Sequence, residues 1–320
     1  MAKTVEPTTQ TTEFDLEMED IEVSNSTVSI PEDEGASKFE DDLNDIPVIS
    51  SKPPAKATGA GIMDFSAFEE GIEDINSESE SYIKGLLYGK NGTGKTYISG
   101  TFPGPRLFLD IRERGLKSVV GAKGDQKKRV VDTFEMFQMA YWYLKNGDHN
   151  YQTVVLDNIT NLQKLILDYA MGKEENWDPN VDKDMPSRRE YGYLSQFMQT
   201  WIINFRNLPM NVVFIAQEKS GDDTDLESDE PTVFPQLTTS VRGIIGGAVD
   251  FIGNTFIKMV EQVNEEKGTA VMVPKYCLRL GPSTKYVTKI RLPQTCNKPA
   301  PPAIANASYA KIKKIMEGEF

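Results

Sequence analysis

Short, nearly continuous runs of apolar residues recur along the chain from residue 81 onward, and stretches of helical periodicity separate them. Runs of this kind, bounded by small or polar residues, are typical of strands buried on both faces of a parallel sheet. The predicted strands span residues 82–88, 106–110, 151–157, 211–217, 249–259 and 285–292. The predicted helices span residues 133–145, 161–171 and 191–207. This alternation predicts an α/β fold, with a mostly parallel sheet flanked by helices.

The folded core is expected to span residues 81–297, with ligands at the carboxyl ends of its strands. Residues 298–320 begin with the proline-rich "KPAPPA", which we interpret as a linker. They continue with "SYAKIKKIM", which predicts a short basic amphipathic helix.

The first 60 residues are rich in Thr, Ser, Glu, Asp and Pro and contain few large apolar side chains. Such a composition buries too little apolar surface to outweigh the entropy of ordering, so a disordered acidic tail is predicted at 1–60. An acidic-apolar linker is expected at 61–80. Residues 39–51 and 62–75 alternate acidic and apolar side chains. One interpretation is that these segments only keep the protein soluble. The alternative is that they form a short motif that docks on a partner protein or on this protein's own DNA-binding site.

Charge is spread unevenly along the chain. Residues 1–80 hold 21 of the 48 acidic residues and 4 of the 35 basic residues, a net charge of −17. The remaining 240 residues carry a net charge of +4, so the overall −13 describes the tail. The acidic total therefore does not exclude nucleic acid as a partner.

Several classes of protein are excluded by composition. The two cysteines, Cys277 and Cys296, are too few for a disulfide framework or a four-ligand zinc site. A single histidine, His149, rules out a triad hydrolase. No signal peptide is apparent, and no run reaches the roughly 18 apolar residues that a membrane span needs. We therefore expect a cytoplasmic protein that does not bind membranes.

The segment "GKNGTGKT", Gly89–Thr96, matches the phosphate-loop pattern G-x-x-x-x-G-K-[ST] between a predicted strand and a helix. Its backbone N–H groups are expected to surround the phosphates of ATP. Lys95 would contact the β- and γ-phosphates, and Thr96 would contact Mg²⁺. The residues expected to contact ATP are Gly89, Asn91, Gly92, Thr93, Gly94, Lys95, Thr96 and Tyr97.

A second contact to Mg²⁺ is expected from Asp157, which ends the apolar strand "TVVLD". The alternative is that Asp157 only caps the following helix. Asp110, at the end of "RLFLD", is the other candidate for this Mg²⁺ contact. It lies in the strand that immediately follows the phosphate loop, so a role at the end of that second strand suits it better.

The general base for hydrolysis has to come from a position other than 158. Many hydrolysing P-loop proteins carry Glu directly after the Mg²⁺-binding Asp, but this chain has Asn158. Glu113, just past the second strand, would reach an in-line water if that strand lies near the phosphate-loop strand. Gln217 ends the strand "NVVFIAQ" and would report hydrolysis to the following loop. Alternatively, Glu113 pairs with a neighbouring arginine and Gln217 is a buried structural residue.

The phosphate loop, "LFLDIRERGLKS", "TVVLDNIT", "LPMNVVFIAQ" and "YVTKIRLP" occur in an order that resembles the phage-encoded RecA-like ATPases. These AAA-type ATP-binding proteins include single-strand annealing recombinases. The resemblance covers residues 81–293 and implies that Glu113 is the catalytic glutamate and Gln217 the switch glutamine. It also implies that Lys289 and Arg291 point at the ATP of a neighbouring subunit. The family has its glutamate two residues after the strand Asp, whereas Glu113 follows Asp110 by three.

In RecA-like proteins the loop after the switch glutamine contacts single-stranded DNA. Here the first half of that loop is strongly acidic, which is unfavourable for phosphate contacts. DNA contacts are therefore expected from Arg242 in its second half, or from "PSRREYG". There Arg188 and Arg189 precede Tyr191, a mixture suited to phosphate contacts and base stacking. The alternative for "SRRE" is a helix cap with ordinary solvated charges.

The preferred interpretation is an ATPase that acts on single-stranded DNA in phage recombination, annealing or replication, in the cytoplasm of a bacterial host. It would form a ring or filament, because a site completed by a neighbour needs a head-to-tail interface. The acidic tail would bind a replication or single-strand-binding protein. The alternative is a nucleotide-switched interaction protein with little turnover. A small-molecule kinase is less favoured because the insertion at 171–189 is acidic, and a helicase because no second motor is evident.

Overall fold

The computed structural model describes residue 72 and residues 82–172, 185–221, 231–264 and 269–320. By contacts, the chain divides into two units, Met1–Ile72 and Glu73–Phe320. The predicted tail at 1–60 lies outside the described residues, as does the 61–80 linker except for Ile72. The first half of the acidic loop, at 222–230, also lies outside them.

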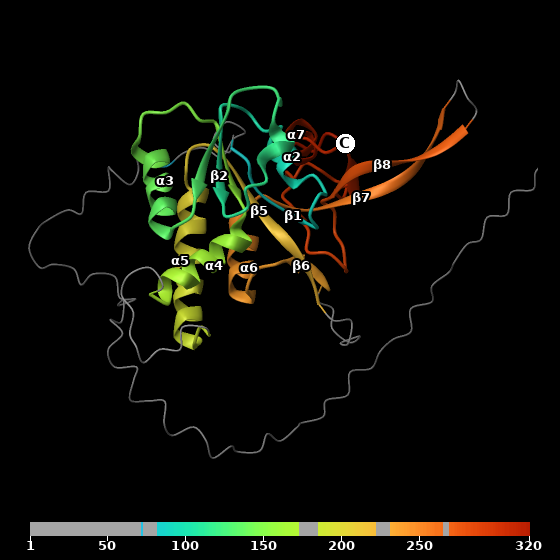
Figure 1. The fold of residues 1–320 in the computed structure, drawn as a ribbon. Helices are drawn as coiled ribbons and strands as arrows, with labels where there is room; N and C mark the ends of the chain where they lie inside the picture. Colours follow the sequence, from blue (N-terminus) through green and yellow to red (C-terminus); the bar gives the residue numbers. More distant parts are fainter. Residues whose placement is uncertain (1–71, 73–81, 173–184, 222–230, 265–268) are drawn as a thin grey trace, which may run out of the picture. The chain divides into compact units, whose positions relative to one another are not determined.

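The second unit is built on a sheet with the strand order β10-β8-β7-β1-β5-β4-β2-β3. From β7 through β1, β5, β4 and β2 to β3, each strand runs parallel to the next, whereas β8 forms an antiparallel hairpin with β7 (Figure 1). The central strands are β1 (Lys84–Gly89), β2 (Arg106–Ile111), β3 (Gln126–Val131), β4 (Thr153–Asp157), β5 (Asn211–Ser220) and β7 (Phe251–Asn264). The others are β6 (Val233–Pro235), β8 (Thr269–Arg279), β9 (Lys289–Ile290) and β10 (Ala303–Ala305). The predicted α/β class and mostly parallel sheet are confirmed.

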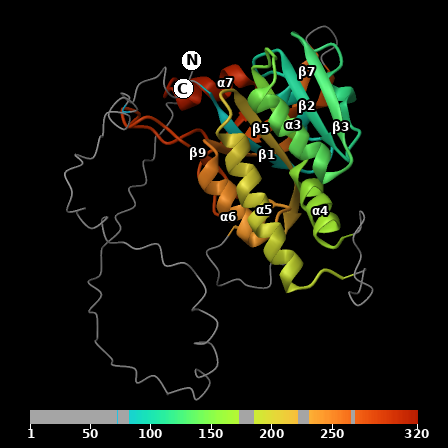
Figure 2. The ribbon, with the colours of Figure 1, turned by 90° about the vertical axis from the view of Figure 1, so that its left-hand side faces the viewer.

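Helices cover both faces of the sheet. On one face lie α3 (Phe134–Asn146), α4 (Ile159–Ala170), α5 (Arg188–Arg206) and α6 (Thr239–Ala248), which pack side by side (Figure 2). On the other face lie α2 (Lys95–Ser99), the 3-10 helix η1 (Leu116–Val119) and α7 (Tyr309–Met316). The pleat of the central strands supplies both layers: along β1, Leu86 faces the first layer and Leu87 the second.

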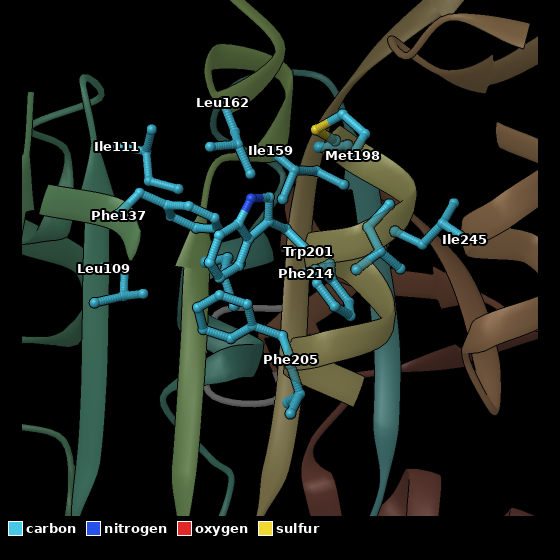
Figure 3. Close-up of a cluster of buried hydrophobic side chains, with 14 of the residues drawn as sticks. Leu109, Ile111, Phe137, Ile159, Leu162, Met198, Trp201, Phe205, Phe214 and Ile245 are labelled. Atoms are coloured by element: carbon cyan, nitrogen blue, oxygen red, sulfur yellow. The ribbon is translucent and has the colours of Figure 1, made fainter. Parts of the chain in front are cut away.

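The first layer is held together by aromatic side chains between α3 and α5. Trp201 contacts Phe137 at a centroid distance of 5.7 Å, and Phe205 contacts Phe137 at 5.1 Å (Figure 3). Both helices thereby rest on the apolar strands β2, β4 and β5, whose side chains lie beneath them (Figure 3). This packing fixes the carboxyl ends of the strands, where the candidate site lies.

Two predicted boundaries change in the structure. The strand expected at 285–292 is reduced to β9, which is two residues long. The expected linker and helix at 298–320 belong to the folded body: β10 pairs with β8, and Ile312 and Ile315 of α7 are buried in the second layer. The prolines at 299, 301 and 302 therefore precede an added edge strand, and the core does not end at residue 297.

Candidate nucleotide-binding site

The phosphate loop follows the central strand β1. Gly89, where β1 ends, lies in register between Gln217 of β5 and Thr255 of β7. A Cβ at position 89 would lie 2.3 Å from the Thr255 hydroxyl and 2.5 Å from its carbonyl oxygen, so only glycine fits there. Gly94 has φ 93°, a left-handed conformation that glycine adopts without strain and that starts α2. Glycine is therefore required at position 89 because a side chain would clash with Thr255, and at position 94 because the backbone is left-handed.

Within the loop, Thr93 is structural. Its buried hydroxyl donates to the Lys90 carbonyl oxygen at 2.7 Å and bonds to the Thr255 hydroxyl at 2.6 Å. Asn91 and Gly92 are exposed at the tip of the loop. Thr93 therefore ties the loop to β7, while the tip is left open to a ligand.

The Lys95 ammonium group folds back over the loop. Its Nζ donates to the carbonyl oxygens of Gly89, at 2.8 Å, and Lys90, at 2.9 Å. Burial lowers the pKa of Lys95, and the nearby carboxylates of Asp157 and Glu113 oppose that shift. A bound phosphate would favour the charged form of Lys95, because it brings negative charge to a partly desolvated cation.

Thr96 of α2 and Asp157 of β4 meet although β4 is not adjacent to β1, the strand that leads into the phosphate loop. The Thr96 hydroxyl donates to Oδ2 of Asp157 at 2.9 Å, and β5 lies between β1 and β4. Burial raises the pKa of Asp157 to about 6, and the Thr96 hydrogen bond opposes that rise. Glu113 and Asp110 raise it further through charge repulsion.

The oxygen atoms at this point fit Mg²⁺. Asp110 pairs in register with Asp157, and its buried Oδ2 has no hydrogen-bond partner among the described residues. Its other oxygen accepts from the Arg114 backbone at 2.7 Å. Across the described ranges, no three His, Cys, Asp or Glu side chains are grouped to hold a metal ion. Mg²⁺ commonly uses one or two carboxylates and takes its other ligands from phosphate and water, so Thr96 and Asp157 would suffice.

Glu113 reaches the same cavity by a route that the sequence did not indicate. The second strand does not lie near the phosphate-loop strand, because β5 and β4 separate β2 from β1. Instead, Oε2 of Glu113 accepts from Asn158 at 2.6 Å and from Asn161 at 3.1 Å. The two amides at the start of α4 thus hold the carboxylate beside Asp157.

The neighbouring arginines do not pair with Glu113. Arg112 bonds to Asp168 at 2.7 Å, and Arg114 lies 3.7 Å from Asp132. The expected alternative, an ion pair between Glu113 and one of these arginines, is therefore not found within the described residues.

A cavity of about 690 Å³ joins these groups to parts of the chain that the sequence did not single out. Its phosphate end is lined by Asn91, Gly92, Gly94, Lys95, Thr96, Glu113, Asp157 and Asn158. The rest of its lining comprises Tyr97, Tyr276, Asn306, Ala307 and Ser308, together with Ile98, Thr101, Gly115 and Ser118. Tyr276 comes from β8, and residues 306–308 lie between β10 and α7. Nothing in the local sequence of these segments signals a ligand.

Gln217 and the two proposed trans-acting residues lie outside the cavity lining. Gln217 is beside Gly89, and its backbone N–H donates to the Thr160 hydroxyl at 3.1 Å. Lys289 donates to the carbonyl oxygens of Gly246 and Val249, at the end of α6. Arg291 pairs with Asp250 at 2.8 Å. Both cations lie near the amino end of β7, away from the phosphate loop of their own chain.

The DNA-binding candidates fall in two places. Arg188, Arg189 and Tyr191 are exposed in the first turn of α5, where Ser187 and Glu190 form a capping box. Arg189 donates to the Tyr193 hydroxyl at 3.2 Å. Arg242 of α6 lies 3.9 Å from the centroid of the Phe234 ring.

These features define a P-loop nucleotide-binding protein: a glycine-turned loop, a lysine and a threonine converge with a strand-end aspartate at the edge of a parallel sheet. Residues 81–292 match the AAA domain family, which is more than half of the chain. The chain belongs to that family of P-loop ATPases. No curated protein matches it.

Among solved structures, the chain is similar to the flagellar accessory protein FlaH from Methanocaldococcus jannaschii. The identity is 10%, the TM-score is 0.28, and the match covers 62% of this chain and 76% of FlaH. None of the helices described in the structure is long and apolar enough to cross a membrane.

Proposed function

We propose that this protein hydrolyses ATP with Mg²⁺ and acts on single-stranded DNA in phage recombination, annealing or replication. The observation that carries the hydrolysis step is the placement of Glu113. Its carboxylate is held by Asn158 and Asn161 and lines one cavity with Lys95, Thr96 and Asp157.

Each of these residues has a role that its position supports. Lys95 would exchange its two loop carbonyl partners for phosphate oxygens of ATP. Thr96 and Asp157 would hold Mg²⁺, which when bound neutralises charge that develops on the phosphates. Glu113 would take a proton from a water aligned with the γ-phosphate, while the two asparagine amides fix the orientation of its carboxylate. Gln217 would relay the loss of the γ-phosphate along β5.

The test is ATP turnover by the full chain, with Glu113→Gln as the diagnostic variant. Loss of a general base costs about 10²–10⁴-fold in rate. We expect Glu113→Gln to lose turnover by about that factor while it keeps ATP binding. Glu135→Gln, on the exposed side of α3, is the matched control and should leave turnover unchanged. Normal turnover in Glu113→Gln would refute the assignment of the base.

DNA binding is supported by exposed aromatic and basic side chains at the start of α5. The Phe197 ring lies 6.2 Å from both Tyr193 and Tyr169, and Tyr169 belongs to α4. Tyr169 and Tyr193 are exposed and Phe197 is half-buried between them, so the two tyrosine rings extend a surface that starts at Arg189. Exposed rings stack on bases, and arginines contact phosphates without regard to sequence.

For this surface, the measurement is the affinity for a fluorescent oligonucleotide over a salt series. Arg188→Ala with Arg189→Ala should weaken binding and reduce the salt dependence by about two phosphate contacts. Arg206→Ala, exposed at the other end of α5, is the control. If the double variant binds like wild type, Arg242 becomes the next candidate.

A neighbouring subunit is proposed to complete the site, since Lys95 is the single cation among the described residues that line the cavity. Lys289 and Arg291 would have to exchange bonds within their own chain for the phosphates of the neighbour. Mixing Arg291→Ala with Glu113→Gln tests this. If the two inactive variants regain turnover when mixed, Arg291 of one subunit acts in the active site of its neighbour. If turnover does not recover, the role of Arg291 is limited to its ion pair with Asp250.

The acidic tail is proposed to recruit a replication or single-strand-binding protein, or to limit DNA binding by imitating DNA. Removal of residues 1–60 should strengthen DNA binding in the second case. Unchanged affinity across the salt series would exclude imitation of DNA.

One observation favours a second candidate, a nucleotide-switched interaction protein with little turnover. Two amides already occupy Oε2 of Glu113, which restricts that oxygen as a proton acceptor. Tight ATP binding with no turnover above that of Lys95→Ala, with or without DNA, would select this candidate.

A further inference from the structure

The part of the cavity lined by Tyr97, Tyr276 and residues 306–308 has a composition unlike that of the phosphate end. It lacks charged side chains among the described residues and presents two tyrosine rings, from Tyr97 and Tyr276, which are 59% and 44% exposed. Neither ring packs against another aromatic ring within the described residues. Partly exposed, unstacked rings on a cavity wall suit a flat heteroaromatic ligand.

The position of Tyr276 relates this wall to the phosphate loop. A Cβ at Gly94 would lie 3.4 Å from Cδ1 of Tyr276, so the ring lies against the residue that precedes Lys95. A nucleotide with its phosphates on the loop would therefore have its sugar and base near Tyr276. The cavity volume of about 690 Å³ is within the usual range of about 300–1,000 Å³ for ligand sites.

Asn306 adds polar groups to the same wall. Its backbone adopts φ 49° and donates from its N–H to the Tyr276 carbonyl oxygen at 2.7 Å. The side-chain amide has no hydrogen bond within the described part of the chain, and the residue is exposed where it lines the cavity. An unoccupied amide offers one donor and one acceptor side by side.

The segment that carries Asn306 is firmly attached to the phosphate-loop helix. The Tyr309 N–H donates to the Thr101 hydroxyl at 2.8 Å, and its ring lies 5.0 Å from that of Phe102. Thr101 and Phe102 come just after α2. Lys311 donates to the Ala305 carbonyl oxygen at 2.8 Å, which closes the turn around Asn306. The segment that carries Asn306 is thus held in place by residues just after α2, the helix that follows the phosphate loop.

From these contacts we propose that Tyr276 and Asn306 form a base-recognition subsite selective for adenine nucleotides. The inference rests on the proposed binding of ATP at the phosphate loop. Tyr276 stacks on the base, and the Asn306 amide pairs with the donor and acceptor that adenine places on one edge. Tyr276 lies within the segment that matches the AAA domain family, residues 81–292, whereas Asn306 lies outside it.

The experiment is competition against a fluorescent ATP analogue, with the full chain, Mg²⁺, and ATP, GTP or tripolyphosphate as competitors. Wild type should bind ATP about tenfold more tightly than GTP, the discrimination expected of one bidentate amide. Asn306→Gly tolerates the positive φ and should lower ATP affinity about tenfold. Tripolyphosphate affinity should not change.

Asn306→Asp sharpens the test because it keeps the shape and replaces the donor by an acceptor. It should lower the ratio of ATP to GTP affinity, since guanine presents two adjacent donors to a carboxylate. Asn297→Asp and Asn297→Gly, exposed in the same C-terminal stretch, are matched controls and should change nothing. Tyr276→Leu should weaken ATP and GTP alike by about tenfold through lost stacking.

Equal affinity of wild type for ATP and GTP would overturn the proposal, as would Asn306 variants with an unchanged ratio. In both cases Lys95→Ala would still weaken the binding of all three competitors by about 100-fold, which preserves the proposed function. If wild type binds none of the three, the proposed function itself fails, and the base subsite fails with it. Melting temperatures of each variant exclude misfolding as the cause of a loss.

Discussion

The two halves of the cavity are built in different ways. The phosphate half comes mainly from one continuous segment, Asn91–Thr96, joined by Glu113 just past β2 and by Asp157 at the end of β4. The proposed base half joins Tyr97, which directly follows Thr96, to Tyr276 and Asn306–Ser308 from distant parts of the sequence. The first half presents charge and backbone groups, and the second presents rings and an amide. Charge would thus supply affinity at one end, while the other end would supply selectivity.

The largest effect is expected from Lys95→Ala, which removes the point charge of the phosphate half. ATP and tripolyphosphate affinity should both fall by about 100-fold, because a charge-assisted contact to phosphate is lost at a partly desolvated site. Lys90→Ala is the matched control, because that exposed side chain belongs to the same loop. If Lys95→Ala still binds tripolyphosphate normally, phosphate affinity does not come from Lys95, and the assignment of charge to the phosphate half is wrong.

Asp157→Asn should have an effect of comparable size, on stability and its pH dependence. The folded-state pKa of about 6 lies above the ordinary value of 3.8, so the folded state binds this proton more tightly than the unfolded state. The carboxylate therefore destabilises the ligand-free protein as pH rises from about 4 through 6. The shift of about 2 pKa units corresponds to about 3 kcal/mol.

Denaturant unfolding of wild type and Asp157→Asn at pH 5 and pH 8 measures this effect. The variant should be more stable than wild type by up to about 3 kcal/mol at pH 8, and the difference should shrink at pH 5. Mg²⁺ with nucleotide should stabilise wild type and not the variant. A difference that is independent of pH would mean that Asp157 titrates normally.

The smallest effect is expected from Ile312→Val, which loosens α7 beneath the base half. Removal of one buried methyl group costs about 1 kcal/mol. Ile245→Val, buried in α6 on the other face of the sheet, should cost the same and is the control. Only Ile312→Val should weaken ATP binding, and tripolyphosphate binding should be normal in both. Equal effects of the two variants on ATP would show that the base half does not depend on α7.

Buried elements and contiguous motifs were the parts of this protein that the sequence predicted well. The strands at 84–89, 106–111 and 153–157 and the first six residues of the strand at 211–220 are buried between two helical layers, so apolar residues dominate them. The strand at Gln126–Val131 was missed because it is an edge strand with three exposed basic residues. The strand at Thr269–Arg279 was missed because its residues pair within a largely exposed ribbon.

Whether a site residue could be predicted from the sequence depends on how that residue is brought to the cavity. The phosphate loop is a local motif with fixed spacing, so sequence alone located it. Glu113 was predicted through a strand position that proved wrong, and it arrives through amides at the start of α4. Tyr276 and Asn306 are brought in by pairing across β8 and β10, and no local pattern encodes such pairing.

The attachment of the segment Ala305–Tyr309 to the end of α2 also has a consequence for synthesis of the protein. The strand that carries the phosphate loop leaves the ribosome early, but its neighbours in the sheet, β5 and β7, follow more than a hundred residues later. Asn306 and Ser308 are made later still. A nascent chain therefore carries its phosphate motif long before the last residues that line the cavity have been made, and the complete cavity forms only after translation reaches Ser308.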